Sequence, residues 1–180
     1  MIKDLTSIPV AVRADPDAVA RLIAAIQAVL TPDLLSPKYK GEAKNGPLSG
    51  HCAVAAEALW HMLGGFRSGT VPHWAPDGDG THHWLVRKSD GERLDPTAGQ
   101  YDGPPPYDKG VAFGYMTRCP SARAQCVIDR IANRLKRDSE PGILVIPALI
   151  RDSMASSRKS FDAKRYSGAK AFYGTCDLRP

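Results

Sequence analysis

Three short segments carry the side chains with the clearest chemical potential. Cys52 follows Gly50-His51 and opens an alanine-rich stretch, His82 lies in a run of aromatic and β-branched residues, and Asp95 follows the next extended run. A thiolate is a strong nucleophile, an imidazole can take the thiol proton, and a carboxylate can hold the second ring nitrogen. The order of thiol, imidazole and acid therefore predicts nucleophilic catalysis at Cys52.

A helix is expected to position the thiol. Residues 52–63 are rich in alanine and other helix formers, and Gly64-Gly65 follows them as a stop signal. Cys52 then lies in the first turn of this helix. Unpaired backbone N–H groups and the helix dipole stabilise a thiolate at that place.

A hairpin is expected to bring the histidine and the acid together. Asp90-Gly91 is a tight-turn signal between two extended runs, residues 82–88 and 92–95. Folding at this turn places His82 beside Asp95. The adjacent His83 points to the opposite face of the strand, so only one of the two histidines can share the site.

The remaining elements complete a mixed α and β pattern. Asp15 and Pro16 are typical of a helix start, and the apolar spacing predicts a helix over residues 15–30. A further helix is expected over residues 121–136, a strand over residues 66–71, and either a strand or a short helix over residues 142–150. We expect an α+β fold with one domain over residues 1–150 and a basic C-terminal extension over residues 151–180.

The composition fits one globular domain. The chain has 180 residues, of which 43% are hydrophobic and 24% are charged. The four cysteines form no CxxC pair, which favours free thiols in a reducing compartment. The sequence contains neither a run of about 18 to 20 apolar residues nor the apolar core of a signal peptide, so we expect a cytoplasmic protein without a membrane span.

The charge is uneven along the chain. Residues 1–120 carry a net charge of −1, whereas residues 121–180 carry +6. A modest basic surplus on a surface helix and a tail usually serves solubility. We therefore expect no nucleic-acid partner.

Several of these motifs resemble those of a known family. The segments GHC, LGG, HHW, DG and LDPT, together with Gln100-Tyr101 and Cys119-Pro120-Ser121, are similar to the pattern of the YunG-like family of small bacterial and phage proteins. The run HHWLVRKSDGERLDPT also resembles the core pattern of transglutaminases. The resemblance covers about residues 45–135. It implies a papain-like or transglutaminase-like fold, in which the helix that bears the nucleophile packs on an antiparallel sheet.

The same resemblance implies an activity and its main residues. The H-x-W pattern selects His82 as the base, with Cys52 as the nucleophile and Asp95 as the residue that orients the imidazole. The implied enzyme is a cysteine hydrolase or acyltransferase that acts on amide or isopeptide bonds through a thioester, as a protease, a deamidase or a transglutaminase does. It would need no cofactor, and its substrate would be a protein or a peptide.

Further residues are candidates for the oxyanion hole and for substrate binding. The backbone N–H of Cys52 is the natural first oxyanion donor. Papain-like enzymes add a side-chain amide upstream, and Asn45 is the amide in the preceding loop. His51 and Trp84 complete this group; Trp84 either shields the imidazole or belongs to the core. Gln100-Tyr101 is interpreted as packing.

Two alternative functions remain open. All five histidines lie within a 33-residue window that also contains Cys52, and zinc favours such ligands. However, no pair has a recognised ligand spacing, so no metal ligands are assigned. The other alternative is a catalytically inactive module of the same fold that binds a partner through its basic C-terminal third.

Overall fold

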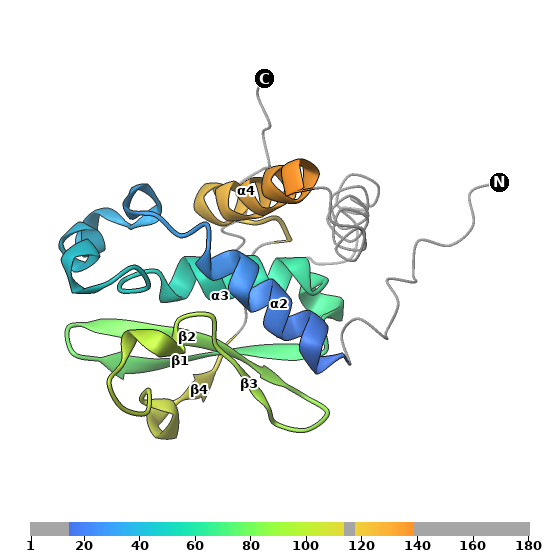
Figure 1. Ribbon diagram of the computed structural model, residues 1–180. Helices are drawn as coiled ribbons and strands as arrows, with labels where there is room; N and C mark the ends of the chain where they lie inside the picture. The colour runs from blue at the N-terminus through green and yellow to red at the C-terminus, as the bar shows by residue number, and fades with distance from the viewer. Residues whose placement is uncertain (1–14, 114–117, 139–180) are drawn as a thin grey trace, which may run out of the picture.

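In the described part of the computed structural model, three α-helices lie on one side of a four-stranded antiparallel sheet (Figure 1). The structure describes residues 15–113 and 118–138. The strands follow the spatial order β3-β2-β1-β4, and every neighbouring pair is antiparallel. The expected α+β class is confirmed. The expected boundary at residue 150 and the segment 142–150 lie outside the described residues.

The first described helix, α2 (Pro16–Gln27), starts where the sequence predicts. The Asp15 side chain accepts a hydrogen bond from the Asp17 backbone N–H at 3.0 Å, and Pro16 occupies the first helical position. Its buried face carries Val19, Leu22 and Ile26. The helix ends three residues before the expected Leu30, ahead of the short 3-10 helix η1 (Pro32–Leu34).

The central helix, α3 (Cys52–Met62), is buried along most of its length. It packs on the sheet through β2 and on both other helices. The left-handed conformation of Gly64, with φ of 103°, follows its C-terminus, as the stop signal predicts. Because α3 lies between the sheet and α4 (Ala122–Asp138), its position is fixed from both sides.

Two long strands, β1 (Thr70–Asp77) and β2 (Gly80–Arg87), form the centre of the sheet. They pair over their full lengths, with Ala75 opposite His82 and His73 opposite Trp84. The short strands β3 (Arg93–Leu94) and β4 (Val111–Ala112) pair with β2 and β1, respectively. The expected hairpin around Asp90-Gly91 is therefore present.

The strand expected over residues 66–71 is a wrong prediction. Residues 65–67 form the 3-10 helix η3 (Gly65–Arg67), and Phe66 is 68% exposed. Gly65 and Gly69 have φ values of 60° and 72°, which extended strands do not adopt. The chain becomes extended only at Thr70.

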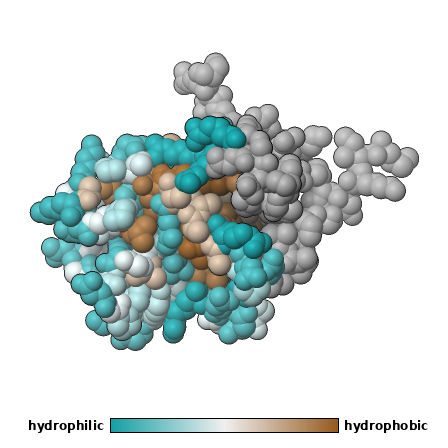
Figure 2. Space-filling model, in the orientation of Figure 1, coloured by the Kyte–Doolittle hydropathy of each residue, from teal (hydrophilic) through white to brown (hydrophobic). Residues whose placement is uncertain are grey.

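The core lies between the helices and the sheet. Its fully buried members include one residue from each of α2, α3, β2 and α4, namely Ile26, Leu59, Leu85 and Ile131. Figure 2 shows apolar residues gathered in the middle of one face, with hydrophilic residues around them. No helix in the described part of the chain is long and apolar enough to cross a membrane.

Candidate active site

Cys52 is the first residue of α3 and is 8% exposed. Its thiol donates a hydrogen bond to the Thr81 carbonyl at 3.2 Å, which ties the start of the helix to the start of β2. First-turn N–H groups have no partner inside a helix, and no hydrogen bond from the Cys52 N–H occurs within the described residues. A backbone donor is therefore available beside the sulfur.

Gly50, two residues before α3, packs closely against the preceding loop. It has a φ of 75°, in the region that favours glycine. A Cβ atom at this position would lie 2.9 Å from a methyl group of Leu35 and 3.1 Å from the Cβ atoms of Tyr39 and Glu42. The absence of a side chain at Gly50 thus allows α3 to start in this position.

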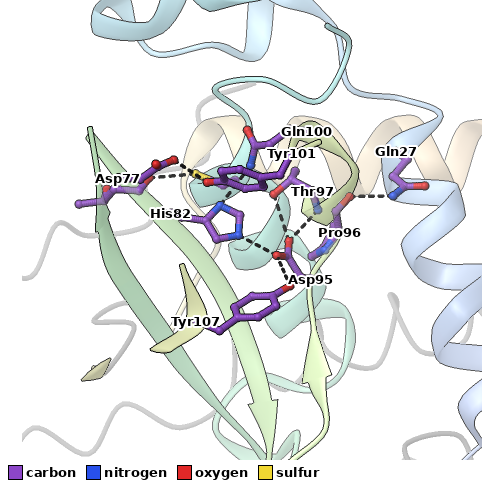
Figure 3. Close-up of polar contacts among 11 residues, drawn as sticks. Gln27, Asp77, His82, Asp95, Pro96, Thr97, Gln100, Tyr101 and Tyr107 are labelled. Atoms are coloured by element: carbon purple, nitrogen blue, oxygen red, sulfur yellow. Dashed lines mark hydrogen bonds and ion pairs between the residues drawn. The ribbon is translucent and has the colours of Figure 1, made fainter. Parts of the chain in front are cut away.

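His82 is fully buried on β2, and both ring nitrogens have partners (Figure 3). Its Nε2 lies 2.7 Å from Oδ2 of Asp95, and its Nδ1 lies 3.1 Å from Nε2 of Gln100. Ala75, the cross-strand neighbour of His82, is small and fully buried. Because the Asp95 carboxylate holds Nε2, whereas the partner of Nδ1 is a neutral amide, Nδ1 is the nitrogen that can take the thiol proton.

Asp95 is held by four hydrogen bonds. Its Oδ2 interacts with Nε2 of His82 and accepts a bond from the Tyr107 hydroxyl at 2.8 Å. Its Oδ1 accepts bonds from the backbone N–H and the hydroxyl of Thr97, at 2.8 and 3.1 Å. The side chain of Asp95 is only 3% exposed. The carboxylate therefore has a single well-defined orientation toward the imidazole.

Burial lowers the pKa of His82, but hydrogen bonds and charge from Asp95 and Cys52 outweigh it and raise that pKa to about 9. Asp95 and Cys52 are thus the two groups that favour the protonated ring. The Cys52 thiol, the His82 imidazole and the Asp95 carboxylate therefore lie close enough to interact electrostatically.

Aromatic rings surround the imidazole. Trp84 is 1% exposed and stacks on His82 with ring centroids 5.7 Å apart. Tyr101 meets the same imidazole edge-on at 5.0 Å, and Tyr107 packs against Trp84. Burial and the nearby Asp77 carboxylate raise the pKa of Tyr101. Trp84 therefore both shields the imidazole and fills the interior.

His83 lies apart from the Asp95 cluster. Its Nε2 lies 2.9 Å from the Thr81 hydroxyl, and its ring meets Phe113 edge-on. Burial and the charge of His82 lower the pKa of His83 to about 4. The structure therefore places His82, not His83, against the acid.

Two other predicted residues have different surroundings. The exposed Asn45 donates its amide to Glu42 at 2.7 Å, at the end of the 3-10 helix η2 (Pro37–Asn45). His51 is buried as the N-cap residue of α3, and its Nε2 donates to the Thr31 carbonyl at 3.0 Å. Neither side chain has a described hydrogen bond to Cys52, His82 or Asp95.

Sequence reasoning missed the contribution of residues 97–107. Gln100, interpreted as packing, bonds to His82, while Thr97 and Tyr107 bond to Asp95. Gln100 is the last residue of the 3-10 helix η4 (Ala98–Gln100), and Tyr107 opens η5 (Tyr107–Lys109). Such short turns lack a periodic signal. The available signals were the position of Gln100-Tyr101 just after the acid and its place in the family pattern that the sequence resembles.

The cysteines differ in state. Cys52 and Cys126 are free thiols. Cys119 is disulfide-bonded, which corrects the expectation of four free thiols. The absence of a CxxC motif did not exclude this bond, because disulfides also join cysteines far apart in sequence.

The histidines do not form a metal-binding cluster among the described residues. No group of three or more His, Cys, Asp or Glu side chains there is arranged to hold an ion. His61 is buried on α3, where burial lowers its pKa to about 4. Closeness in sequence therefore does not bring the five histidines together.

No family model, curated protein or solved structure matches this chain.

Proposed function

We propose that this protein is a cysteine hydrolase or acyltransferase of papain-like or transglutaminase-like architecture, acting on amide or isopeptide bonds of a protein or peptide. The observation that carries the proposal is the buried His82, bonded to Asp95 through one nitrogen and electrostatically coupled to Cys52. The placement of Cys52 at the start of α3 adds support, because backbone N–H groups meet the thiol there.

The reaction begins with a proton transfer. The S–H bond of Cys52 breaks, Nδ1 of His82 takes the proton, and Asp95 stabilises the resulting imidazolium through Nε2. The thiolate then attacks the substrate carbonyl carbon. The backbone N–H of Cys52 donates to the oxyanion of the tetrahedral intermediate.

Collapse of this intermediate breaks the C–N bond. The leaving amine takes the proton from Nδ1, and a thioester remains on Cys52. Water or a second amine then attacks the thioester, with His82 as general base, and restores the thiol. Water yields hydrolysis, whereas an amine yields acyl transfer.

Selective alkylation tests the nucleophile. Native protein is treated with iodoacetamide at pH 6, and labelling of Cys52 and Cys126 is followed by mass spectrometry. We expect Cys52 to react at least about tenfold faster, because thiolate is the reactive form. Both thiols are free, so Cys126 is the internal control. Equal rates for the two thiols would contradict the proposal.

Turnover tests the reaction class. A library of peptide coumarylamides is incubated with wild type, Cys52→Ala and the matched Cys126→Ala. We expect amide cleavage by wild type and Cys126→Ala, and a loss of at least about a thousandfold in Cys52→Ala. Hydroxylamine should trap the acyl group as a hydroxamate. Activity that survives in folded Cys52→Ala would overturn the proposal.

A further inference from the structure

We propose that Gln100 is a positioning residue that holds Nδ1 of His82 in both protonation states of the ring. This inference deepens the proposed function, because Nδ1 is the nitrogen assigned to the thiol proton. Nε2 of Gln100 lies 3.1 Å from Nδ1, on the side of the ring opposite Asp95 (Figure 3). The imidazole is therefore held at both ends.

One segment supplies both contacts. Asp95 binds Nε2, Thr97 fixes Asp95, and the η4 turn then returns the chain so that Gln100 reaches Nδ1. The Gln100 backbone N–H donates to the Thr97 carbonyl at 3.0 Å, which closes the turn. Gln27 of α2 donates to the Pro96 carbonyl at 2.8 Å and ties the segment to the helices. The amide is thus anchored through its own backbone.

An amide suits this position because it has both a donor and an acceptor. When the ring is neutral with its proton on Nε2, the Gln100 NH₂ donates to the Nδ1 lone pair. When the Nδ1 lone pair takes the thiol proton, the hydrogen bond from the Gln100 NH₂ breaks, and rotation of the amide presents its oxygen as the acceptor for the new N–H. The ring therefore keeps its place as the proton moves between Sγ and Nδ1.

A carboxylate would not serve both states. Glutamate at position 100 accepts from a protonated Nδ1 but offers no donor to a neutral one. Its charge also favours the imidazolium and opposes a thiolate nearby. The titratable groups that surround His82 are Asp95, Cys52, Tyr101, Tyr107 and His83. Among the described residues, the Asp95 carboxylate contacts Nε2, and no carboxylate contacts Nδ1. A glutamate at position 100 would therefore add a negative charge beside Nδ1.

The test compares Gln100→Glu with Gln125→Glu as a matched control. Gln125 is half-buried on α4, where it bonds to Asp129. His82 is titrated by ¹⁵N NMR of its ring, and the pH profile of Cys52 alkylation by iodoacetamide is recorded. We expect both midpoints to rise by at least about one pH unit in Gln100→Glu. Gln125→Glu should stay within about 0.3 unit of wild type, since a charge on α4 is remote from His82 and partly exposed to solvent, which screens it.

Midpoints in Gln100→Glu that match those of Gln125→Glu would overturn the proposal. If Gln100→Glu does not fold, Gln100→Leu replaces it, with the Cys52 alkylation rate at pH 7 expected to fall about tenfold through misplacement of the imidazole. A wild-type rate in folded Gln100→Leu would also overturn the proposal. The ring titration needs no substrate, so its result is separate from whether amide cleavage occurs.

Discussion

Asp95 fixes the orientation of His82 although it does not contact Cys52 through any described hydrogen bond. Its four hydrogen bonds come from a histidine, a tyrosine and a threonine. None of these bonds reaches the sulfur, yet the carboxylate sets which nitrogen of His82 remains available. The identity of residue 95 therefore affects the proton affinity of His82 as well as the orientation of its ring.

The raised pKa of His82 makes stability depend on pH. A group that binds its proton more tightly when folded stabilises the protein fully below its unfolded pKa of 6.5 and loses this contribution as pH rises to about 9. The contribution is on the order of 3 kcal/mol. We expect the free energy of unfolding to fall between these pH values, and urea titrations at each pH measure it.

Asp95→Asn is the control for that pH dependence. Asparagine keeps an oxygen for Nε2 of His82 but removes the charge that favours the imidazolium. The slope of stability against pH should therefore be clearly smaller in Asp95→Asn. An unchanged slope would assign the pH dependence to other groups.

Residue-level prediction was most successful where partners are close in sequence. His82 and Asp95 are 13 residues apart and joined by a hairpin, so alternation and a turn signal place them side by side. The partners of Gln100 and Asn45 could not be derived this way. Each residue ends a 3-10 helix, and such turns aim a side chain by backbone angles that the sequence pattern does not reveal.

At the scale of elements, the position of the start of α3 depends on the close packing of Gly50 against the preceding loop. Gly50→Ala places a Cβ atom against Leu35, Tyr39 and Glu42 at 2.9 to 3.1 Å, in addition to the strain of a positive φ. We expect a loss of about 3 kcal/mol in the free energy of unfolding, together with slower alkylation of Cys52. Urea denaturation and iodoacetamide labelling measure the two effects.

Gly69→Ala separates strain from crowding. Gly69 has a φ of 72°, close to the 75° of Gly50, but a Cβ atom there meets nothing within 4 Å. Its alanine variant should lose only about 1 to 2 kcal/mol and keep the wild-type alkylation rate. Equal losses in both variants would show that packing around Gly50 does not matter.

The helices were more predictable than the strands. Caps, glycine stops and apolar spacing mark α2, α3 and α4 in the sequence. Strand β1 contains Pro72 and Pro76, which weaken a strand pattern, and it is recognisable only through its full-length pairing with β2. Tertiary pairing, rather than local preference, therefore determines where this strand begins.

For the whole molecule, α3 is the element that packs against both other helices and the sheet. Leu59 is fully buried in the core cluster that joins the helices to the sheet. Leu59→Ala should lower the free energy of unfolding by about 3 kcal/mol through lost burial and a cavity. Leu135→Ala, at a partly buried position on α4, should cost clearly less. Equal losses in urea denaturation would contradict a core centred on α3.

The hydrogen bond from Cys52 to Thr81 spans 29 residues, whereas His82 meets Asp95 and Gln100 within 18 residues. The cluster of His82, Asp95 and Gln100 thus forms locally, from a hairpin and one turn, whereas the Cys52 sulfur reaches it only when α3 docks on the sheet. Thiol reactivity should therefore report long-range assembly during refolding. In stopped-flow refolding, the proposed nucleophile Cys52 should reach its native alkylation rate only with the final docking step, after hairpin formation.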